Sequence, residues 1–221
     1  MKVEVQNLQF SYGAGDFRIS IPELTVPTGQ SLGIVGPSGC GKTTFLNIVS
    51  TVTRLRQGRL TLGDVNPAEM TDAKCREFRA KNIGYVYQDF GLIDYLSGRE
   101  NLLYPFFVTG RRGDAALNSR IDQLTAEFGI THVLGRKPQN ISQGERQRLA
   151  ICRAILGMPS LILADEPTGN LDPANKSSIL DHLCRQCQTT GATLIVVTHD
   201  RNLTDRFDQV IDFSDFAQVT R

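Results

Sequence analysis

The segment GPSGCGKTT, residues 36–44, restricts the fold more strongly than any other part of the chain. It follows a short apolar run at residues 32–35 and precedes a helical pattern at residues 45–55. It matches G-x-x-x-x-G-K-[S/T], in which glycines let the backbone curl until several N–H groups converge on one point. We therefore predict a strand, a glycine-rich loop and a helix in direct succession, the arrangement called a P-loop.

A P-loop binds the phosphates of a nucleoside triphosphate, and the residue types here suit that task. Lys42 brings a positive charge to the terminal phosphates, and the Thr43 hydroxyl is placed to bind Mg²⁺. A chance match is roughly one in a hundred for a chain of ordinary composition. A glycine turn with a surface lysine is therefore the weaker interpretation. The predicted nucleotide-binding residues are Gly36, Pro37, Ser38, Gly39, Cys40, Gly41, Lys42, Thr43 and Thr44.

Cys40 lies inside this loop and has two interpretations. Neighbouring amides, Lys42 and the start of a helix all favour a thiolate, so we expect alkylation of Cys40 to abolish nucleotide binding and bound nucleotide to protect it. The alternative is a small side chain that only fills a tight turn.

The segment LILADEP, residues 161–167, predicts a buried strand that ends in two carboxylates. Asp165 at the tip of the strand is placed to assist Mg²⁺, directly or through a water molecule. Glu166 follows it, where it can take a proton from an attacking water. Alone, this motif is explained equally well by two exposed acids; together with a P-loop it favours catalysis.

Ser142 and Glu145 fit an S-x-x-E capping box, so we predict that a helix begins at Ser142. The start of a helix also attracts anions, because its free N–H groups and its dipole both favour negative charge. Asp172 and Pro173 predict the start of a later helix in the same way.

Strands and helices alternate along the rest of the chain. Runs without polar alternation are typical of strands buried on both faces, and the helical stretches have apolar residues at helical spacing. This pattern predicts an α/β fold with a largely parallel sheet. The strands are expected at residues 32–35, 83–87, 161–164 and 194–197, and two further helices at residues 117–128 and 179–187.

Composition excludes several classes of protein. The 221 residues suit one domain, and the net charge of +1 gives no support for a nucleic-acid partner. We find neither a signal-peptide core at the start nor an apolar run of about 18 residues, so a membrane role requires another chain. The odd count of five cysteines suits a reducing cytoplasm, and the C-x-x-C at Cys184 and Cys187 is better explained by packing on a helix than by metal binding.

The P-loop, QGERQR, LILADE and THD occur in an order that resembles the ATP-binding subunit of an ABC transporter, over essentially the whole chain. The resemblance implies ATP and Mg²⁺ as ligands and adds site residues. Tyr12 matches an aromatic that stacks on the nucleotide. Gln88 matches a catalytic glutamine that also binds Mg²⁺, and His199 matches a catalytic switch histidine.

The resemblance also implies a nucleotide-binding core at about residues 1–88 and 156–221, with an N-terminal antiparallel β part, and a helical subdomain at about residues 89–155. Two copies are expected to pair head to tail, so that each ATP meets the signature segment of the partner. Gln143 departs from the family pattern, which has glycine there, and Glu145 replaces the usual glutamine. The expected trans residues are Ser142, Gln143, Gly144, Glu145, Asn170 and Asp172.

The segments TGNLD and SQGERQRLAICRAI resemble the ATPases of lipoprotein-releasing, macrolide-exporting and cell-division ABC systems. This resemblance implies an integral-membrane permease as partner and a place at the cytoplasmic face of the inner membrane. The alternative is an ATPase of the cell-division type, which switches a membrane partner without transporting a substrate. Residues 89–101, with Ile93 and Tyr95, are expected to form part of the permease-docking surface.

Overall fold

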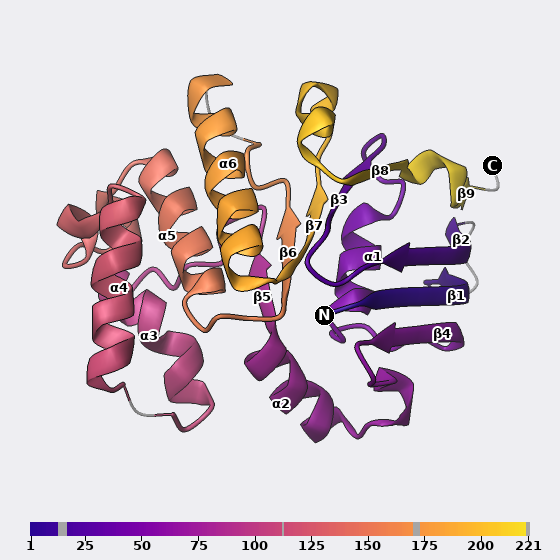
Figure 1. The fold of residues 1–221 in the computed structure, drawn as a ribbon, viewed down its shortest axis with the longest axis horizontal. Helices are drawn as coiled ribbons and strands as arrows, with labels where there is room; N and C mark the ends of the chain where they lie inside the picture. The colour runs from indigo at the N-terminus through magenta and orange to yellow at the C-terminus, as the bar shows by residue number, and fades with distance from the viewer. Residues whose placement is uncertain (13–16, 112, 170–172, 220–221) are drawn as a thin grey trace.

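A five-stranded parallel sheet forms the centre of the molecule (Figure 1). The computed structural model describes residues 1–12, 17–111, 113–169 and 173–219. The strands lie in the order β5-β6-β7-β3-β8, and all neighbouring pairs are parallel. Their bounds are β3 Ser31–Val35, β5 Ile83–Val86, β6 Leu161–Asp165, β7 Thr193–Val197 and β8 Gln209–Asp212. The predicted strands are therefore confirmed, and β8 is an addition.

The apolar runs in the sequence reflect burial of this sheet on both faces. All residues of β6 and β7 are buried. In β6, Leu161 and Leu163 pack into one apolar cluster, whereas Ile162 and Ala164 pack into the cluster on the opposite face. Because successive side chains of a strand point to opposite faces, a strand between two cores needs apolar residues at every position.

An antiparallel sheet covers the face that also carries α1 (Figure 1). Its order is β4-β1-β2-β9, so a strand near the C-terminus completes the sheet that the N-terminus begins. Val3 and Val5 on β1 are fully buried against the same cluster as Phe45 of α1. The antiparallel β part is thus confirmed. The bounds are β1 Val3–Ser11, β2 Phe17–Val26, β4 Gln57–Leu62 and β9 Ala217–Val219.

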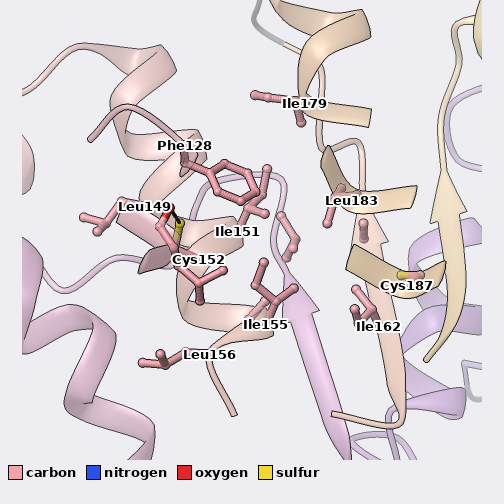
Figure 2. Packing of buried hydrophobic residues seen from close by; sticks show 14 of the residues in the cluster. Phe128, Leu149, Ile151, Cys152, Ile155, Leu156, Ile162, Ile179, Leu183 and Cys187 are labelled. Carbon is pink, nitrogen blue, oxygen red and sulfur yellow. Dashed lines mark hydrogen bonds between the residues drawn. The ribbon is translucent and has the colours of Figure 1, made fainter. Parts of the chain in front are cut away.

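Helices cover the other face of the parallel sheet. Figure 2 shows Ile151 and Ile155 of α5 directed toward Leu183 and Ile162, so that α5 and α6 pack on the sheet through one apolar cluster. Cys187 lies in this cluster on α6 as a buried free thiol. The helices are α1 Lys42–Val49, α2 Asp72–Asn82, α3 Gly98–Val108, α4 Ala115–Glu127, α5 Gln143–Ile155 and α6 Pro173–Thr190.

Five short 3₁₀ helices connect these elements in the described residues: η1 Pro67–Glu69, η2 Thr131–Val133, η3 Pro138–Asn140, η4 Arg201–Arg206 and η5 Phe213–Asp215. Helices α3, α4 and α5 lie within residues 89–155, the range predicted for a helical subdomain. No helix in the described residues has the length and apolar character needed to cross a bilayer.

The end of α1 corrects the sequence analysis. The helical pattern extended to residue 55, but the helix ends at Val49. Thr51 has a left-handed backbone with φ of 62°, and the Ser50 hydroxyl donates a hydrogen bond to the Asn47 carbonyl. These local conformations end the helix, and Leu55 packs against the core from the following loop. The predicted cap at Asp172 lies outside the described residues.

Candidate functional site

A cavity of about 440 Å³ opens where β3, β6 and β7 end. Because these strands are parallel, their carboxyl ends meet at one edge of the sheet, where α/β proteins bind ligands. The volume is in the range of small-molecule sites. The cavity is lined by Tyr12, Ser38, Gly39, Gly41, Lys42, Thr43, Thr44, Gln88, Asp165, Glu166, Val197 and His199.

The loop between β3 and α1 has the backbone that a P-loop requires. Gly39 and Gly41 have φ values of 80° and 100°, which residues with a Cβ rarely adopt. Gly41 is the N-cap of α1 and provides no side-chain cap, so the first amides of the helix remain available to an anion. The Lys42 ammonium donates hydrogen bonds of 2.8 Å to the carbonyls of Gly36 and Pro37. It therefore lies along the loop, where phosphate oxygens can exchange with these carbonyls.

Cys40 does not face this cavity in the way that the thiolate interpretation assumes. Its side chain is 6% exposed and packs into the apolar cluster that contains Phe45. A Cβ on Gly36 would come within 3.0 Å of its sulfur, so the turn leaves little room around the thiol. The thiol also lies 3.9 Å from Lys42 Nζ, but Cys40 does not line the cavity, so the structure favours the alternative, a small side chain that fills the turn.

Asp165 and Thr43 fit a magnesium site. The Asp165 side chain is buried, and its Oδ1 has no hydrogen-bond partner among the described residues. Burial raises the pKa of Asp165, and a hydrogen bond from the Thr43 hydroxyl opposes this shift. A buried carboxylate oxygen with no partner is destabilising, and a hard cation that prefers oxygen ligands would satisfy it. No group of three or more His, Cys, Asp or Glu side chains in the described residues is arranged to hold a metal, so phosphate oxygens and water would supply the remaining ligands.

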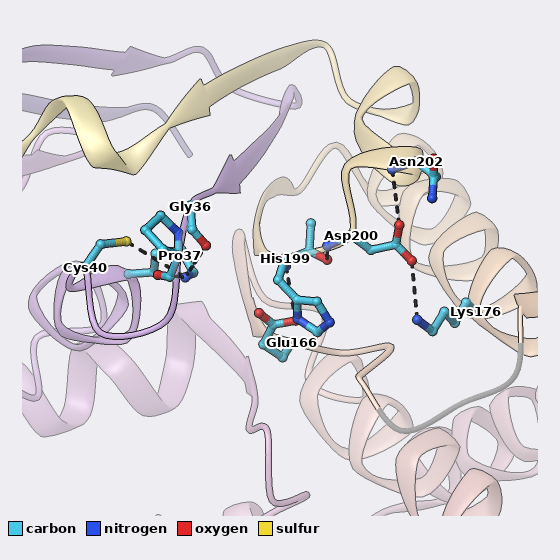
Figure 3. A network of polar contacts seen from close by, with 10 residues as sticks. Gly36, Pro37, Cys40, Glu166, Lys176, His199, Asp200 and Asn202 are labelled. Carbon is cyan, nitrogen blue, oxygen red and sulfur yellow. Dashed lines mark hydrogen bonds and ion pairs between the residues drawn. The ribbon is translucent and has the colours of Figure 1, made fainter.

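Glu166 and His199 form a hydrogen-bonded pair at the cavity (Figure 3). His199 Nδ1 lies 2.8 Å from Glu166 Oε2, and the His199 backbone N–H donates to the same oxygen at 3.4 Å. Glu166 has a left-handed backbone with φ of 48°, and its N–H donates to the Val197 carbonyl at 2.9 Å. A strained backbone at the end of a buried strand re-aims the side chain, and such strain is common at functional sites.

Tyr12 and Gln88 also reach the cavity. The Tyr12 hydroxyl is 3.2 Å from the Thr44 hydroxyl, the residue is 58% exposed, and its ring is perpendicular to that of Phe10 at a centroid distance of 4.8 Å. Gln88 lies in the turn after β5 and lines the same cavity. The structure therefore brings most of the predicted cis residues together at this cavity, whereas Gly36, Pro37 and Cys40 do not line it.

The residues expected to act in trans at the ATP of a second copy do not line this cavity in the described part of the chain. Ser142 is the N-cap of α5, and both hydrogen bonds of the predicted capping box are present, which confirms the start of that helix. Among the described residues that line the cavity, none comes from residues 142–145. Asn170 and Asp172 lie outside the described residues.

Two polar contacts near these sites were not predicted. Lys176 of α6 forms a 3.3 Å ion pair with Asp200 (Figure 3). The Asp200 carboxylate also accepts a hydrogen bond from the backbone N–H of Asn202, which caps η4 and fixes the chain after His199. Glu145 is 2.7 Å from His132 on η2. The Asp-x-Asn spacing at residues 200–202 is a local signal for the cap, whereas the sequence has no signal for either ion pair.

A P-loop beside a strand-end carboxylate pair defines a P-loop nucleoside triphosphatase. A family model described as ABC transporter matches residues 20–169, and the chain belongs to that family as an ATP-hydrolysing, ATP-binding subunit.

Individual relatives agree. The chain is 37% identical over 217 residues to the lipoprotein-releasing system ATP-binding protein LolD of Geobacter metallireducens, a match that spans 96% of each chain. It is 35% identical over 206 residues to an uncharacterized ABC transporter ATP-binding protein, YvcR, of Bacillus subtilis, covering 92% of this chain and 79% of the relative. The dimeric post-hydrolysis structure of the ATP-binding cassette MJ0796 with ADP and Pi has a TM-score of 0.84 at 28% identity, and 99% of each chain is covered.

Proposed function

We propose that two copies of this chain close on MgATP and drive a membrane permease of the lipoprotein-releasing type, at the cytoplasmic face of the inner membrane. The observation that carries the pairing is the separation of the two anion-binding elements. The P-loop, Asp165 and Glu166 line one cavity, whereas the N-terminus of α5 is not part of it. A second copy with its α5 opposite this cavity would complete the site. The names of relatives support both parts of the proposal, since MJ0796 is described as dimeric and LolD as part of a lipoprotein-releasing system.

The side chains of the cavity suggest how hydrolysis proceeds. Lys42 and the loop amides bind the phosphates, while Thr43, Asp165 and Gln88 would hold Mg²⁺. When bound, this cation neutralises charge that develops on the phosphates. Glu166 takes the proton of the attacking water, and His199 fixes the carboxylate of Glu166 through the 2.8 Å contact. The ring of Tyr12 stacks on the base.

Changing Glu166 to Gln tests this assignment. The amide keeps the size of the side chain but cannot accept the proton, so turnover should fall by about 10²–10⁴-fold. ATP should still bind, and an ATP-dependent dimer should become visible by size-exclusion chromatography. Hydrolysis at the natural rate in this variant would refute the role of Glu166, and a monomer at every ATP concentration would refute the paired site.

A groove of about 610 Å³ between α2, β5 and α3 is the proposed docking surface for the permease. Its apolar wall includes Tyr104, Phe106 and Val108 of α3, and Val108 is 62% exposed. Among the residues that the structure describes, five basic side chains line it beside a single acidic one. They are Arg76, Arg79, Lys81, Arg111 and Arg153, and the acid is Asp89. We therefore propose that the occupant is a short cytoplasmic helix with an apolar face and at least one acidic residue.

The groove adjoins the segment after Gln88. Arg153 of α5 donates a 2.7 Å hydrogen bond to the carbonyl of Phe90 and a second bond to the carbonyl of Gly91. Asn101 is fully buried and bonds the backbone of Ile93 through both its oxygen and its nitrogen. These bonds connect α3 and α5 to the segment that follows Gln88. A helix bound in the groove can therefore bias the position of Gln88.

Two variants distinguish this groove from the surface around residues 89–101. Val108→Glu places a charge on the groove wall, whereas Tyr95→Glu changes a side chain that is 74% exposed but is not among the groove residues. We expect Val108→Glu to abolish stimulation of ATP hydrolysis by the reconstituted permease and Tyr95→Glu to preserve it. If Tyr95→Glu abolished the stimulation and Val108→Glu preserved it, the docking surface would instead be the segment that contains Ile93 and Tyr95. Loss of basal ATP hydrolysis in either variant would show that the change acts on folding or on nucleotide binding.

A further inference from the structure

Glu145 is turned back onto the first residue of its own helix and is held there from two sides. Its Oε2 accepts hydrogen bonds from the Ser142 backbone N–H at 2.7 Å and from the Ser142 hydroxyl at 2.6 Å. Its Oε1 lies 2.7 Å from Nε2 of His132. His132 belongs to η2, on the connection between α4 and α5, and its side chain is 56% exposed whereas that of Glu145 is 16% exposed.

This carboxylate occupies a helix end that is expected to meet another anion. The capping box satisfies the Glu145 N–H, so the first-turn amides left for a ligand are those of Gln143 and Gly144. The Ser142 hydrogen bonds, together with the charge and hydrogen bond of His132, lower the pKa of Glu145 to about 2, so it is ionised at neutral pH. A free carboxylate here would repel a phosphate and compete for the same donors.

We propose that His132 is a positioning residue for the composite ATP site, because it holds the Glu145 carboxylate between Ser142 and η2 and offsets its negative charge. The inference rests on the proposed function, in which the N-terminus of α5 faces the phosphates of the ATP bound by the second copy. With Glu145 held in this way, those phosphates meet the amides of Gln143 and Gly144. Without His132, the uncompensated carboxylate opposes closure of the dimer.

The chain offers a matched control for the loss of an imidazole. His182 on α6 lies 3.6 Å from Glu127, and its ring packs 4.8 Å from the ring of Phe128. This pair has the same two residue types at a longer distance, since His182 Nδ1 has no hydrogen-bond partner among the described residues, and it joins α4 to α6. The His182→Ala variant therefore reports the effect of losing a histidine–glutamate pair by itself.

The experiment measures the ATP-dependent monomer–dimer equilibrium by analytical ultracentrifugation, in the Glu166→Gln background that prevents turnover. His132→Ala should weaken the dimer by roughly tenfold, the value of one charged hydrogen bond. ATP affinity measured at protein concentrations below the dimer dissociation constant should not change, because the P-loop cavity is intact. His132→Arg, which places a hydrogen-bond donor and a positive charge at this position, should restore most of the loss, and His182→Ala should leave the dimer unchanged.

A double-mutant cycle separates positioning from a general structural effect. In a Glu145→Gln background the side chain at position 145 carries no charge, so His132→Ala should have little further effect on the dimer. An equal loss in both backgrounds, or no loss in either, would overturn the positioning role while leaving the paired site intact. If the Glu166→Gln chain forms no dimer with ATP, the proposed function itself fails and the inference fails with it.

Discussion

The Asp165→Asn variant should be more stable than the natural chain in metal-free buffer, although it loses a residue that the reaction needs. The Asp165 side chain is 4% exposed, and its Oδ1 has no partner among the described residues. A buried charged group that lacks a partner destabilises a fold by about 1–3 kcal/mol. The Thr43 hydroxyl and the Lys42 ammonium offset part of this effect, so we expect a gain in the lower half of that range.

The pH dependence follows from the direction of the pKa shift. Burial raises the pKa of Asp165 above the ordinary value of 3.8. Between the two values the folded chain keeps a proton that the unfolded chain has lost, so the free energy of unfolding decreases as pH rises. The penalty is fully present above the raised pKa and is relieved below 3.8. The advantage of Asp165→Asn should therefore be largest at neutral pH and shrink as pH falls toward that value.

Thermal denaturation between about pH 4 and pH 8, which covers the range above the ordinary pKa of the Asp165 carboxyl, is followed by circular dichroism. For a domain of this size about 1 kcal/mol shifts the Tm by about 2–4 °C, so a gain of about 1–2 kcal/mol should raise the Tm by about 2–8 °C at pH 7.5 in EDTA. MgATP at 100 times its Kd should stabilise the natural chain by about 2.7 kcal/mol. For the Asp165→Asn variant, ATP with Mg²⁺ should raise the Tm no more than ATP alone. Asp94→Asn, a change at an exposed position, controls for the loss of charge. A variant that is less stable at neutral pH in EDTA, or whose advantage does not vary with pH, would refute the buried-charge explanation.

Three further predictions concern single side chains. His199→Ala should lower turnover by about 10²-fold with little change in ATP affinity, because the Glu166 carboxylate is no longer fixed; an unchanged rate would make His199 a structural residue. Alkylation of Cys40 should be slow in the folded chain and slower with MgATP, because the thiol is buried beside the loop, and rapid labelling detected by mass spectrometry would contradict this packing. Arg153→Lys should lower the Tm, because lysine lacks the planar fork whose two nitrogens reach the carbonyls of Phe90 and Gly91 separately. An unchanged Tm would show that these bonds do not stabilise the segment that follows Gln88.

The sequence by itself determined the features whose physical cause lies within a few consecutive residues. The glycines of the P-loop specify a backbone that other residues rarely adopt, and the capping box at Ser142 and Glu145 specifies where a helix begins. Apolar residues at every position predicted strands buried on both faces, which in turn place Asp165 at the same sheet edge as the P-loop.

The end of α1 shows where this local reasoning stops. Apolar residues continue past Val49 at positions compatible with a helix, so the pattern alone extends the helix to residue 55. The left-handed backbone at Thr51 and the hydrogen bond from Ser50 to Asn47 end it earlier. Leu55 is still partly buried, because the loop packs it against the core.

Only the tertiary structure decided the directions and long-range partners of individual side chains. The sequence places Cys40 among phosphate-binding amides, but the turn directs its side chain into the apolar core. His132 meets Glu145 because the chain between α4 and α5 passes the start of α5, and Arg153 meets the backbone after Gln88 because α5 packs against β5. Such contacts join segments that are distant along the chain, so no local pattern encodes them. They depend on the packing of whole helices, which the sequence specifies only through the sum of many weak apolar contacts.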